Sequence, residues 1–391
     1  MGAPVKVACV GGGPANLYFS ILMKRVDPSH DITIYERNPA GSTYGWGVTY
    51  WDELFNDLHR ADADSARAIS ESSVRWDSWV ADIRDRATVT VEQGEAGYGI
   101  SRRRLLGILA ERAESLGVRI EWEREITDQD GFGDADLVVA GDGVNSVLRD
   151  RHAEHFGPEF HTGQNIYIWL GTTKVFDAFV FAFVETEHGW IWCYGYKYSQ
   201  EHSTCVIECT PETWRGLGLD QGKEADSLAI LEKLFADILD GHPLIGRAQA
   251  DGTAHWLHFR TLTNRTWHHG NVVLVGDAAH TTHYSIGAGT ALALADASVL
   301  AKALYQEKDL ETALTAYERE SKSKLRSPQR AARYSARWFE SLPRYIDRSP
   351  MQVITLLGQR HSVLQPLVPP ALYYQFDRIA GRVGGLFGFG R

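Results

Sequence analysis

The opening of the chain constrains its fold more than any other feature. A short apolar run, Val5 to Val10, ends in Gly11-Gly12-Gly13-Pro14, and apolar residues at helical spacing follow from Ala15 to Arg25. A second short strand, Ile32 to Tyr35, then closes on Glu36. This order of strand, glycine turn, helix, strand and acid predicts a βαβ unit of a parallel sheet that binds a dinucleotide.

Each part of this unit has a physical role in holding a nucleotide. Gly11 and Gly13 permit a tight turn, which lets backbone amides approach a pyrophosphate at the positive end of the following helix. Glu36 offers a carboxylate to the hydroxyls of a ribose. Asn16 stands where this motif usually has its third glycine, so we expect the helix and strand to pack less closely there. The predicted nucleotide-binding residues of the unit are Gly11, Gly13, Pro14, Ala15, Asn16, Glu36 and Arg37.

A second motif, late in the chain, repeats the order of buried strand and glycine loop. Asp277 follows the apolar strand Val272 to Val275, where its carboxylate can accept a hydrogen bond from a ribitol or ribose hydroxyl. Gly287 and Gly289 then open a helix from about Thr290 to Tyr305. The amide end of that helix is suited to face a flavin or a phosphate.

A third motif lies between the other two. A short strand, Asp136 to Val139, leads to Asp142-Gly143, which taken alone is a plain turn. One Rossmann signature does not separate NAD from FAD. Because three separated motifs occur in one chain, their combination predicts FAD bound in an extended form.

Composition narrows the class of protein further. The chain has 391 residues with 44% hydrophobic and 23% charged residues, which indicates two domains or one large composite. A net charge of -10 argues against a nucleic-acid surface. The cysteines Cys9, Cys193, Cys205 and Cys209 lack metal-site spacing, so we expect reduced, buried thiols and no metal. No run of eighteen apolar residues occurs, so we expect no membrane partner and a cytoplasmic location.

The middle and end of the chain follow other patterns. Alternating apolar and polar residues from Asn165 to about Arg260 predict an antiparallel sheet that carries the substrate. The remainder is predicted to be helical, with breaks near Pro328, Pro343 and Pro366. We therefore expect a discontinuous FAD-binding domain, a substrate domain and a C-terminal helical region. Their boundaries are 1–42, 97–160 and 268–330 for the first, 43–96 and 161–267 for the second, and 331–391 for the third.

These motifs also carry a family resemblance across nearly the whole chain. The Gly11 loop, Asp142-Gly143 and Gly276-Asp277 resemble the three fingerprints of the single-component FAD-dependent aromatic hydroxylases, the class that includes para-hydroxybenzoate hydroxylase. Longer runs resemble the hydroxylases of salicylyl-CoA and anthraniloyl-CoA and the tryptophan-derivative hydroxylase of violacein biosynthesis. These runs are Gly45 to Val48, Tyr167 to Thr172, Thr186 to Trp190, His280 to Gly287, Gln329 to Arg333 and Trp338 to Glu340.

The resemblance implies a fold and a set of cofactor contacts. The expected fold is α/β, with a Rossmann-like FAD-binding domain of the para-hydroxybenzoate hydroxylase type interleaved with an antiparallel-sheet substrate domain and followed by a helical C-terminus. Glu36 would hold the adenosine ribose, Arg102 the pyrophosphate and Asp277 the ribityl region. Arg103 and Arg104 compete with Arg102, because three adjacent arginines at a helix start repel one another unless an anion lies close.

The resemblance implies a chemistry as well. NADH or NADPH reduces the flavin, and a flavin C4a-hydroperoxide hydroxylates an electron-rich ring without a metal. His283 and Tyr284 precede the glycine loop and are the predicted substrate-side residues, since a histidine can orient or deprotonate a ring hydroxyl. Trp46 lies between two glycines and is predicted to line an aromatic pocket. The alternatives are a structural histidine, a packed tyrosine and a core tryptophan.

The predicted substrate is an aromatic small molecule, held as a salicylyl or anthraniloyl thioester on CoA or a carrier protein and hydroxylated at position 5. Ala291 argues against the thioester, because the thioester-type relatives often have lysine there. One alternative is a hydroxylase of a free or indole-type aromatic. A flavoprotein reductase or dehydrogenase on the same fold and a non-catalytic dinucleotide-binding module are others.

Overall fold

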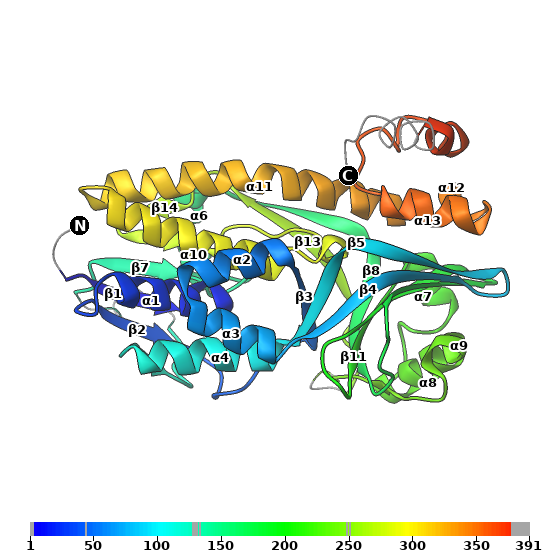
Figure 1. Cartoon of the computed structure of the whole chain (residues 1–391), viewed down its shortest axis with the longest axis horizontal. Coiled ribbons are helices and arrows are strands. Elements are labelled where there is room, and N and C mark those ends of the chain that lie inside the picture. The colour runs from blue at the N-terminus through cyan, green and yellow to red at the C-terminus, as the bar shows by residue number, and fades with distance from the viewer. Residues whose placement is uncertain are drawn as a thin grey trace.

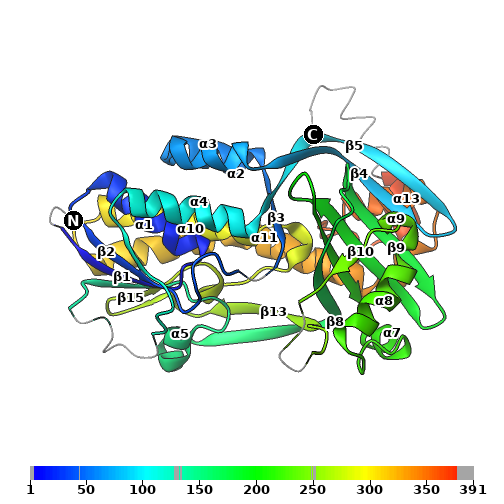
Figure 2. The same cartoon turned by 90° about the horizontal axis from the view of Figure 1, so that it is seen from below.

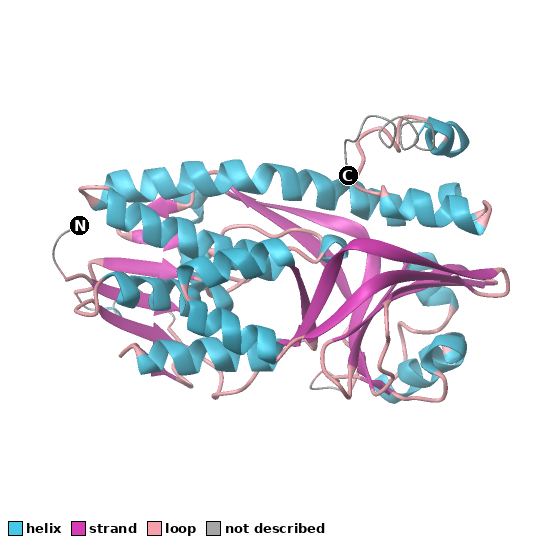
Figure 3. Cartoon of the chain, in the orientation of Figure 1, coloured by secondary structure: helices cyan, strands magenta, loops and turns pink. Residues whose placement is uncertain are grey.

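Two sheets lie toward opposite ends of the molecule, and a long helix runs along both (Figures 1 and 2). The computed structural model describes residues 4–43, 45–126, 132, 134–247, 249 and 252–376. Helices flank the first sheet, whereas the second is a large, strongly twisted sheet of long strands (Figure 3). The mixed α/β fold with a helical C-terminal part is the one expected from the sequence.

The first sheet has six strands in the order β14-β15-β7-β1-β2-β6. All neighbouring strands are parallel except the β14–β15 pair. The central strands β1, β7 and β15 are buried on both faces, as their apolar runs predict. The strand bounds are β1 Lys6–Val10, β2 Asp31–Tyr35, β6 Arg119–Glu121, β7 Leu137–Ala140, β14 His268–His269 and β15 Val272–Leu274.

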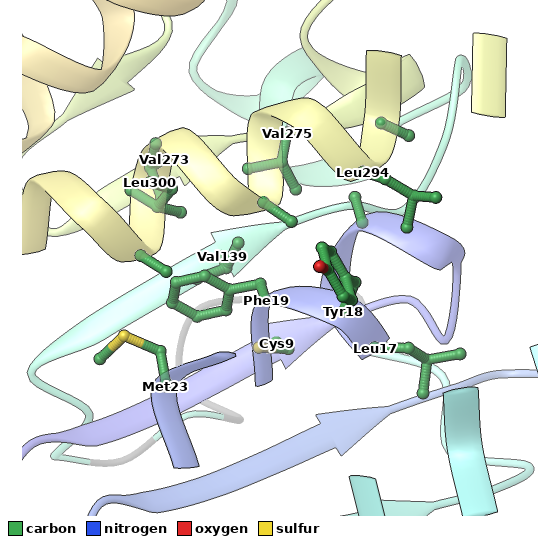
Figure 4. Close-up of a cluster of buried hydrophobic side chains, with 14 of the residues drawn as sticks. Cys9, Leu17, Tyr18, Phe19, Met23, Val139, Val273, Val275, Leu294 and Leu300 are labelled. Carbon is green, nitrogen blue, oxygen red and sulfur yellow. The ribbon is translucent and has the colours of Figure 1, made fainter. Parts of the chain in front are cut away.

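Helices α1 (Pro14–Val26), α4 (Arg102–Ser115) and α10 (Gly289–Gln306) share one hydrophobic core with this sheet. Figure 4 shows Phe19 and Met23 of α1 beside Leu300 of α10, over Val139 of the sheet. The N-terminal βαβ unit and the late helix, far apart in sequence, are thus packed into one body. Short helices α5 (Val147–Arg151) and α6 (Ala153–Phe156) follow β7.

The second sheet has nine strands, in the order β12-β8-β11-β10-β9-β4-β5-β3, with β13 paired to β8. It is antiparallel apart from the β4–β9 pair. The first bounds are β3 Gly47–Trp51, β4 Val74–Ile83, β5 Ala87–Ser101, β8 Pro158–Thr172 and β9 Phe179–Thr186. The others are β10 Gly189–Lys197, β11 Ser203–Cys209, β12 Leu244–Ile245 and β13 Leu257–Asn264.

Both faces of the second sheet are covered, so its central strands read as continuous apolar runs. Side chains alternate along each strand, and Trp192 joins a core with the C-terminal helices while Cys193 joins a core with α8 on the other face. All four cysteines are buried free thiols, as expected. The covering helices are α7 Pro211–Gly216, α8 Glu224–Leu234, α9 Ala236–Leu239, α12 Pro343–Ile346 and α13 Pro350–Gly358.

Helices α2 (Asp52–Ala61) and α3 (Ala63–Glu71) lie between strands of the second sheet. One sequence prediction needs correction. The predicted break at Pro328 is wrong, because α11 runs unbroken from Leu310 to Glu340 with this proline inside it. Proline removes one helical hydrogen bond, but buried residues on both sides of it, among them Leu325 and Ala332, hold the helix against its neighbours. The break at Pro343 is confirmed, since α12 begins there.

Candidate active site

A cavity of about 890 Å³ lies where the loops of the first sheet meet the second sheet. One end is lined by residues that follow β1, β7 and β15, and the other by residues of β8 to β11 and β13. Loops at the carboxyl ends of parallel strands are the usual ligand site of such sheets. The volume is also within the usual range for a site that takes an organic ligand.

Two helices begin at the wall of this cavity with uncapped first turns. Pro14 begins α1 and Gly289 begins α10, and no side chain caps either helix. Gly13, Ala15 and Thr290 line the cavity beside them. The free N–H groups of a first turn carry partial positive charge, so this arrangement attracts a phosphate.

The backbone requires glycine at two positions beside the cavity, because φ is positive there and no room is left for a Cβ atom. Gly11 has φ +96°, and a Cβ atom there would lie 2.6 Å from the Gly141 carbonyl oxygen. Gly287 has φ +64°, and a Cβ atom there would lie 2.6 Å from Thr49 Oγ1. Gly143, also at positive φ, lines the cavity. The three glycine loops therefore bring backbone close to one space.

Asp277 and Arg102 carry the opposite charges at the end of the cavity that the loops of the first sheet form, here called the nucleotide end. Both line the cavity, and no described residue hydrogen-bonds to the Asp277 carboxylate. Burial raises the pKa of Asp277, whereas Arg102 and His280 oppose that rise. Burial likewise lowers the pKa of Arg102, and Asp277 opposes the change. A carboxylate and a guanidinium that line one cavity and form no hydrogen bond with each other are placed to bind polar parts of a ligand.

The structure separates the three adjacent arginines. Arg102 Nε donates to Thr43 Oγ1 at 3.1 Å, and its side chain reaches the cavity. Arg103 and Arg104 are exposed on the solvent side of α4. Arg104 contacts Ser72 Oγ at 3.2 Å instead. The arrangement favours Arg102 as the phosphate-binding residue, which remains a prediction.

Two other predicted nucleotide residues, Asn16 and Glu36, do not line the cavity. The Asn16 amide is fully buried and donates to the carbonyls of Val10 (2.8 Å) and Gly11 (2.9 Å), so it ties α1 to β1. Glu36 accepts from Gly12 N at 2.6 Å and from Asn38, which places its carboxylate at the glycine turn.

Asp142 and Arg37 complete the predicted nucleotide residues. Asp142 Oδ2 accepts from Val147 N at 2.8 Å, while its Oδ1 is buried without a partner among the described residues. Burial raises the pKa of this carboxyl, and hydrogen bonds from Ser146 and Val147 oppose the rise. Arg37 is exposed and does not line the cavity.

The three predicted substrate-side residues have different surroundings. Tyr284 lines the cavity, whereas His283 and Trp46 do not. His283 Nδ1 caps the turn η3 (Tyr284–Ile286) by accepting from Ser285 N. Burial lowers the pKa of His283 to about 3, so its imidazole is neutral at physiological pH and a weak base. Trp46 packs on Gly171, and its Nε1 donates to the Trp169 carbonyl at 3.2 Å.

Comparison with known proteins identifies the family. The FAD binding domain family matches residues 4–327. The chain is 35% identical to salicyloyl-CoA 5-hydroxylase of a Streptomyces species, over 88% of this chain and 66% of that protein. It is also 35% identical to 3-hydroxy-4-methyl-anthranilyl-(aryl-carrier protein) 5-monooxygenase of Streptosporangium sibiricum, over 87% of this chain and 90% of that one. The chain belongs to the FAD-dependent aromatic monooxygenases.

Two further likenesses agree with this family. Protodeoxyviolaceinate monooxygenase of Chromobacterium violaceum is 29% identical over 94% of this chain and 97% of its own length. The solved structure of 2-methyl-3-hydroxypyridine-5-carboxylic acid oxygenase superposes with a TM-score of 0.69 at 19% identity, over 95% of this chain and 96% of that one. The resemblance and the fold predicted from the sequence are thereby confirmed.

The nucleotide end of the cavity fits the FAD that this family binds. Two uncapped helix N-termini and Arg102 offer positive charge, while Asp277 offers a hydrogen-bond acceptor in the same cavity. A dinucleotide needs both, because it combines a pyrophosphate with sugar hydroxyls.

The other end of the cavity, formed by the second sheet, is here called the substrate end. Sequence reasoning missed two residues at this end. Glu208 of β11 is 1% exposed and accepts hydrogen bonds from Tyr284, Tyr194 and Asn165. A single acid inside the apolar run Ser203 to Cys209 was a usable signal, because a carboxylate is rarely buried without a partner.

Arg360 lines the cavity just beyond α13 and donates to the Ser285 carbonyl at 2.9 Å. Its guanidinium lies over the rings of Phe181 and Trp79, at 5.4 and 5.8 Å from their centres. Burial lowers the pKa of Arg360 to about 10, and Tyr194 opposes that change. No local pattern marks this arginine, since only the packing of the C-terminal helices brings it to the site.

None of the helices in the described ranges combines the length and apolar character needed to cross a bilayer. Those same ranges hold no group of three or more histidine, cysteine, aspartate or glutamate side chains arranged to bind a metal ion.

Proposed function

We propose that this monooxygenase hydroxylates, at position 5, an aromatic ring that carries an ortho amino or hydroxyl group beside an acyl thioester. NADH or NADPH is the proposed reductant, and CoA or a carrier protein the proposed thioester partner. The observation that carries the proposal is the pair of relatives at 35% identity, one named for salicyloyl-CoA and one for an anthranilyl group on a carrier protein. Both names specify position 5.

The chemistry of such a ring agrees with that position. An amino or hydroxyl group at position 2 enriches the carbon para to it, which is position 5. Bound FAD supplies the activation of oxygen, with electrons from the nicotinamide. The protein must therefore hold the ring, keep water out and stabilise the charge that develops on the ring.

The described residues of the substrate end are suited to those tasks. Tyr167, Tyr194 and Tyr284 line the cavity with their rings packed together, the Tyr167 and Tyr284 centres lying 4.5 Å apart. Phe181 and Phe259 extend the aromatic wall. Flat aromatic walls bind an aromatic ring and exclude water.

The residues proposed to hold FAD are those of the nucleotide end: the first turn of α1 from Gly13 to Ala15, Arg102, Asp277 and the loop from Gly287 to Thr290. Arg102 and the two helix N-termini would face phosphate, and Asp277 a hydroxyl of the cofactor. His283 would keep Tyr284 in place by capping its turn.

A hydroxylase of a free or indole-type aromatic is the second candidate. The protodeoxyviolaceinate monooxygenase relative, which matches nearly the whole chain, favours it. So does Ala291, at the first turn of α10, where the thioester-type relatives often have lysine.

Coupled turnover separates the two candidates. Purified FAD-loaded protein is supplied with salicyloyl-CoA or anthraniloyl-CoA, and in parallel with the free acids and tryptophan, while NAD(P)H and oxygen consumption are followed. We expect a thioester to accelerate NAD(P)H oxidation and to yield the 5-hydroxylated product. Turnover of a free aromatic, with no thioester accelerating flavin reduction or being hydroxylated, would replace this proposal by the second candidate.

A further inference from the structure

Glu208 anchors a hydrogen-bond network behind the aromatic wall of the cavity. In the register of the second sheet it lies opposite Trp192 on one side and Tyr167 on the other. Its Oε2 accepts from Tyr284 at 2.5 Å and from Tyr194 at 2.8 Å. Its Oε1 accepts from Asn165 Nδ2 at 2.7 Å. A single carboxylate therefore receives three donors, two of them hydroxyls from the cavity wall.

The network is satisfied when Glu208 carries no proton. An ionised carboxylate only accepts hydrogen bonds, and here three donors point at it. Burial raises the pKa of Glu208, and the bonds from Tyr284, Asn165 and Tyr194 oppose that rise. In that ionised form the carboxylate has no proton to give, so both tyrosines direct their hydroxyl protons toward it and away from the cavity.

The two tyrosines differ in whether the hydroxyl oxygen can still accept a hydrogen bond from a ligand. Trp192 Nε1 donates to the Tyr194 oxygen at 3.1 Å, so that hydroxyl both donates and accepts within the protein. No described residue donates to the Tyr284 oxygen, although the Tyr284 side chain lines the cavity. Its hydroxyl proton is committed to Glu208, and its oxygen is left as an acceptor.

We propose that Glu208 is a positioning residue that sets substrate specificity, by holding Tyr284 as a hydrogen-bond acceptor toward the cavity. The cavity then favours a ring that presents an N–H or O–H group to Tyr284 over a ring that lacks one. This inference rests on the proposed function only in that an aromatic ring occupies the cavity. It makes the electron-donating group of the ring the feature that the protein recognises.

A purely structural role explains the network less well. Burying a carboxylate in a sheet costs free energy that an apolar side chain of similar size avoids. The rest of β11 consists of small or apolar residues and packs without such a group. The hydroxyls of two cavity-lining tyrosines converge on this carboxylate, so it controls the hydrogen-bonding groups that a ligand meets.

Two ligands test this specificity. Salicyloyl-CoA carries an ortho hydroxyl, and 2-fluorobenzoyl-CoA carries an atom of similar size without a proton. The dissociation constant of each ligand for FAD-loaded protein is measured from the change in flavin absorbance. The corresponding free acids, salicylate and 2-fluorobenzoate, serve as a second pair. We expect wild-type protein to bind the hydroxyl-bearing ring about tenfold to a hundredfold more tightly, because an unmatched buried polar group is costly.

Three variants assign that preference to the network. In Tyr284→Phe the acceptor is gone, so the ratio of the two constants should fall close to one. In Glu208→Gln, Asn165 holds the amide oxygen, which leaves the amide NH₂ facing the tyrosines. Tyr284 then receives a hydrogen bond and can turn its own proton to the cavity, so the preference for a donor should fall at least tenfold. Glu232→Gln is the matched control, since Glu232 likewise accepts a backbone hydrogen bond, from Leu244 N at 2.8 Å, and forms no hydrogen bond with the network.

The binding experiment and the turnover experiment can fail independently of each other. If Glu208→Gln and Tyr284→Phe keep FAD and retain the wild-type ratio, the inference is wrong even where the thioester is hydroxylated. If wild-type protein shows no preference for the hydroxyl-bearing ring in either pair, or binds none of the four ligands, it is also wrong. If no thioester is turned over but the ratio falls in both variants and not in Glu232→Gln, this inference stands and the proposed function does not.

Discussion

Replacing Arg102 by glutamine is expected to weaken FAD binding, because the substitution removes the one guanidinium of the Arg102 to Arg104 cluster that lines the cavity. Within the described chain its side chain donates to the Thr43 hydroxyl, and its backbone N–H to the Trp46 carbonyl. The same side chain lines the nucleotide end of the cavity. A hydrogen bond to a charged group contributes about 1.5 to 3 kcal/mol. At 1.4 kcal/mol per factor of ten, the expected rise in the FAD dissociation constant is roughly tenfold to 150-fold.

The chain supplies its own matched controls for this measurement. Arg103→Gln and Arg104→Gln remove the same charge from the exposed side of the same helix, where a surface contact contributes about 0 to 1 kcal/mol. Apoprotein of each variant is titrated with FAD, and the change in flavin fluorescence gives the constant. We expect the two control variants to stay near the wild-type value. Unchanged affinity in Arg102→Gln, or an equal loss in Arg103→Gln, would refute the assignment of the phosphate-binding arginine.

Three further predictions concern other residues of the site. Asp277→Ala removes an acceptor from the nucleotide end and should cost roughly 1 to 3 kcal/mol of FAD binding, seen as flavin lost on a desalting column; wild-type retention of FAD would contradict it. The pKa of His283 is depressed in the folded protein, so its contribution to stability is present above pH 6.5 and is lost as the pH falls toward about 3. Between pH 7 and pH 5, the unfolding free energy of wild-type protein should therefore fall by about 2 kcal/mol more than that of His283→Asn, as measured by urea titrations. An equal fall in both proteins would exclude a buried neutral histidine. Trp46→Phe removes the bond to the Trp169 carbonyl and should lower stability by about 0.5 to 1.5 kcal/mol while leaving ligand preference unchanged; a changed preference would instead support a direct substrate contact.

Some features of the site are determined by local sequence. The turn after β1 needs Gly11 because its φ is positive and the Gly141 carbonyl lies against it, and a buried parallel strand needs an apolar run. Such requirements involve residues close in sequence, so Asp277 after β15 and the glycines before α10 could be recognised without a structure. The combination of these motifs predicted FAD, and the family resemblance that they carry predicted the fold.

Other features depended on contacts between distant segments. The choice among Arg102, Arg103 and Arg104 depends on which side of α4 faces the cavity. The continuation of α11 through Pro328 depends on the packing of its two halves.

The surroundings of Tyr284 show the same limit most clearly. Its partner Glu208 lies 76 residues away, and their contact forms only when β11 pairs with β8 and β10 and the loop before α10 packs on that sheet. The sequence by itself predicted FAD and marked the turns where we expect it to bind, because helix termini and tight turns are local structures. Only the tertiary structure decided which polar groups line the cavity and which groups they bond, because hydrogen-bond partners in a sheet are set by the register of strands far apart in the chain.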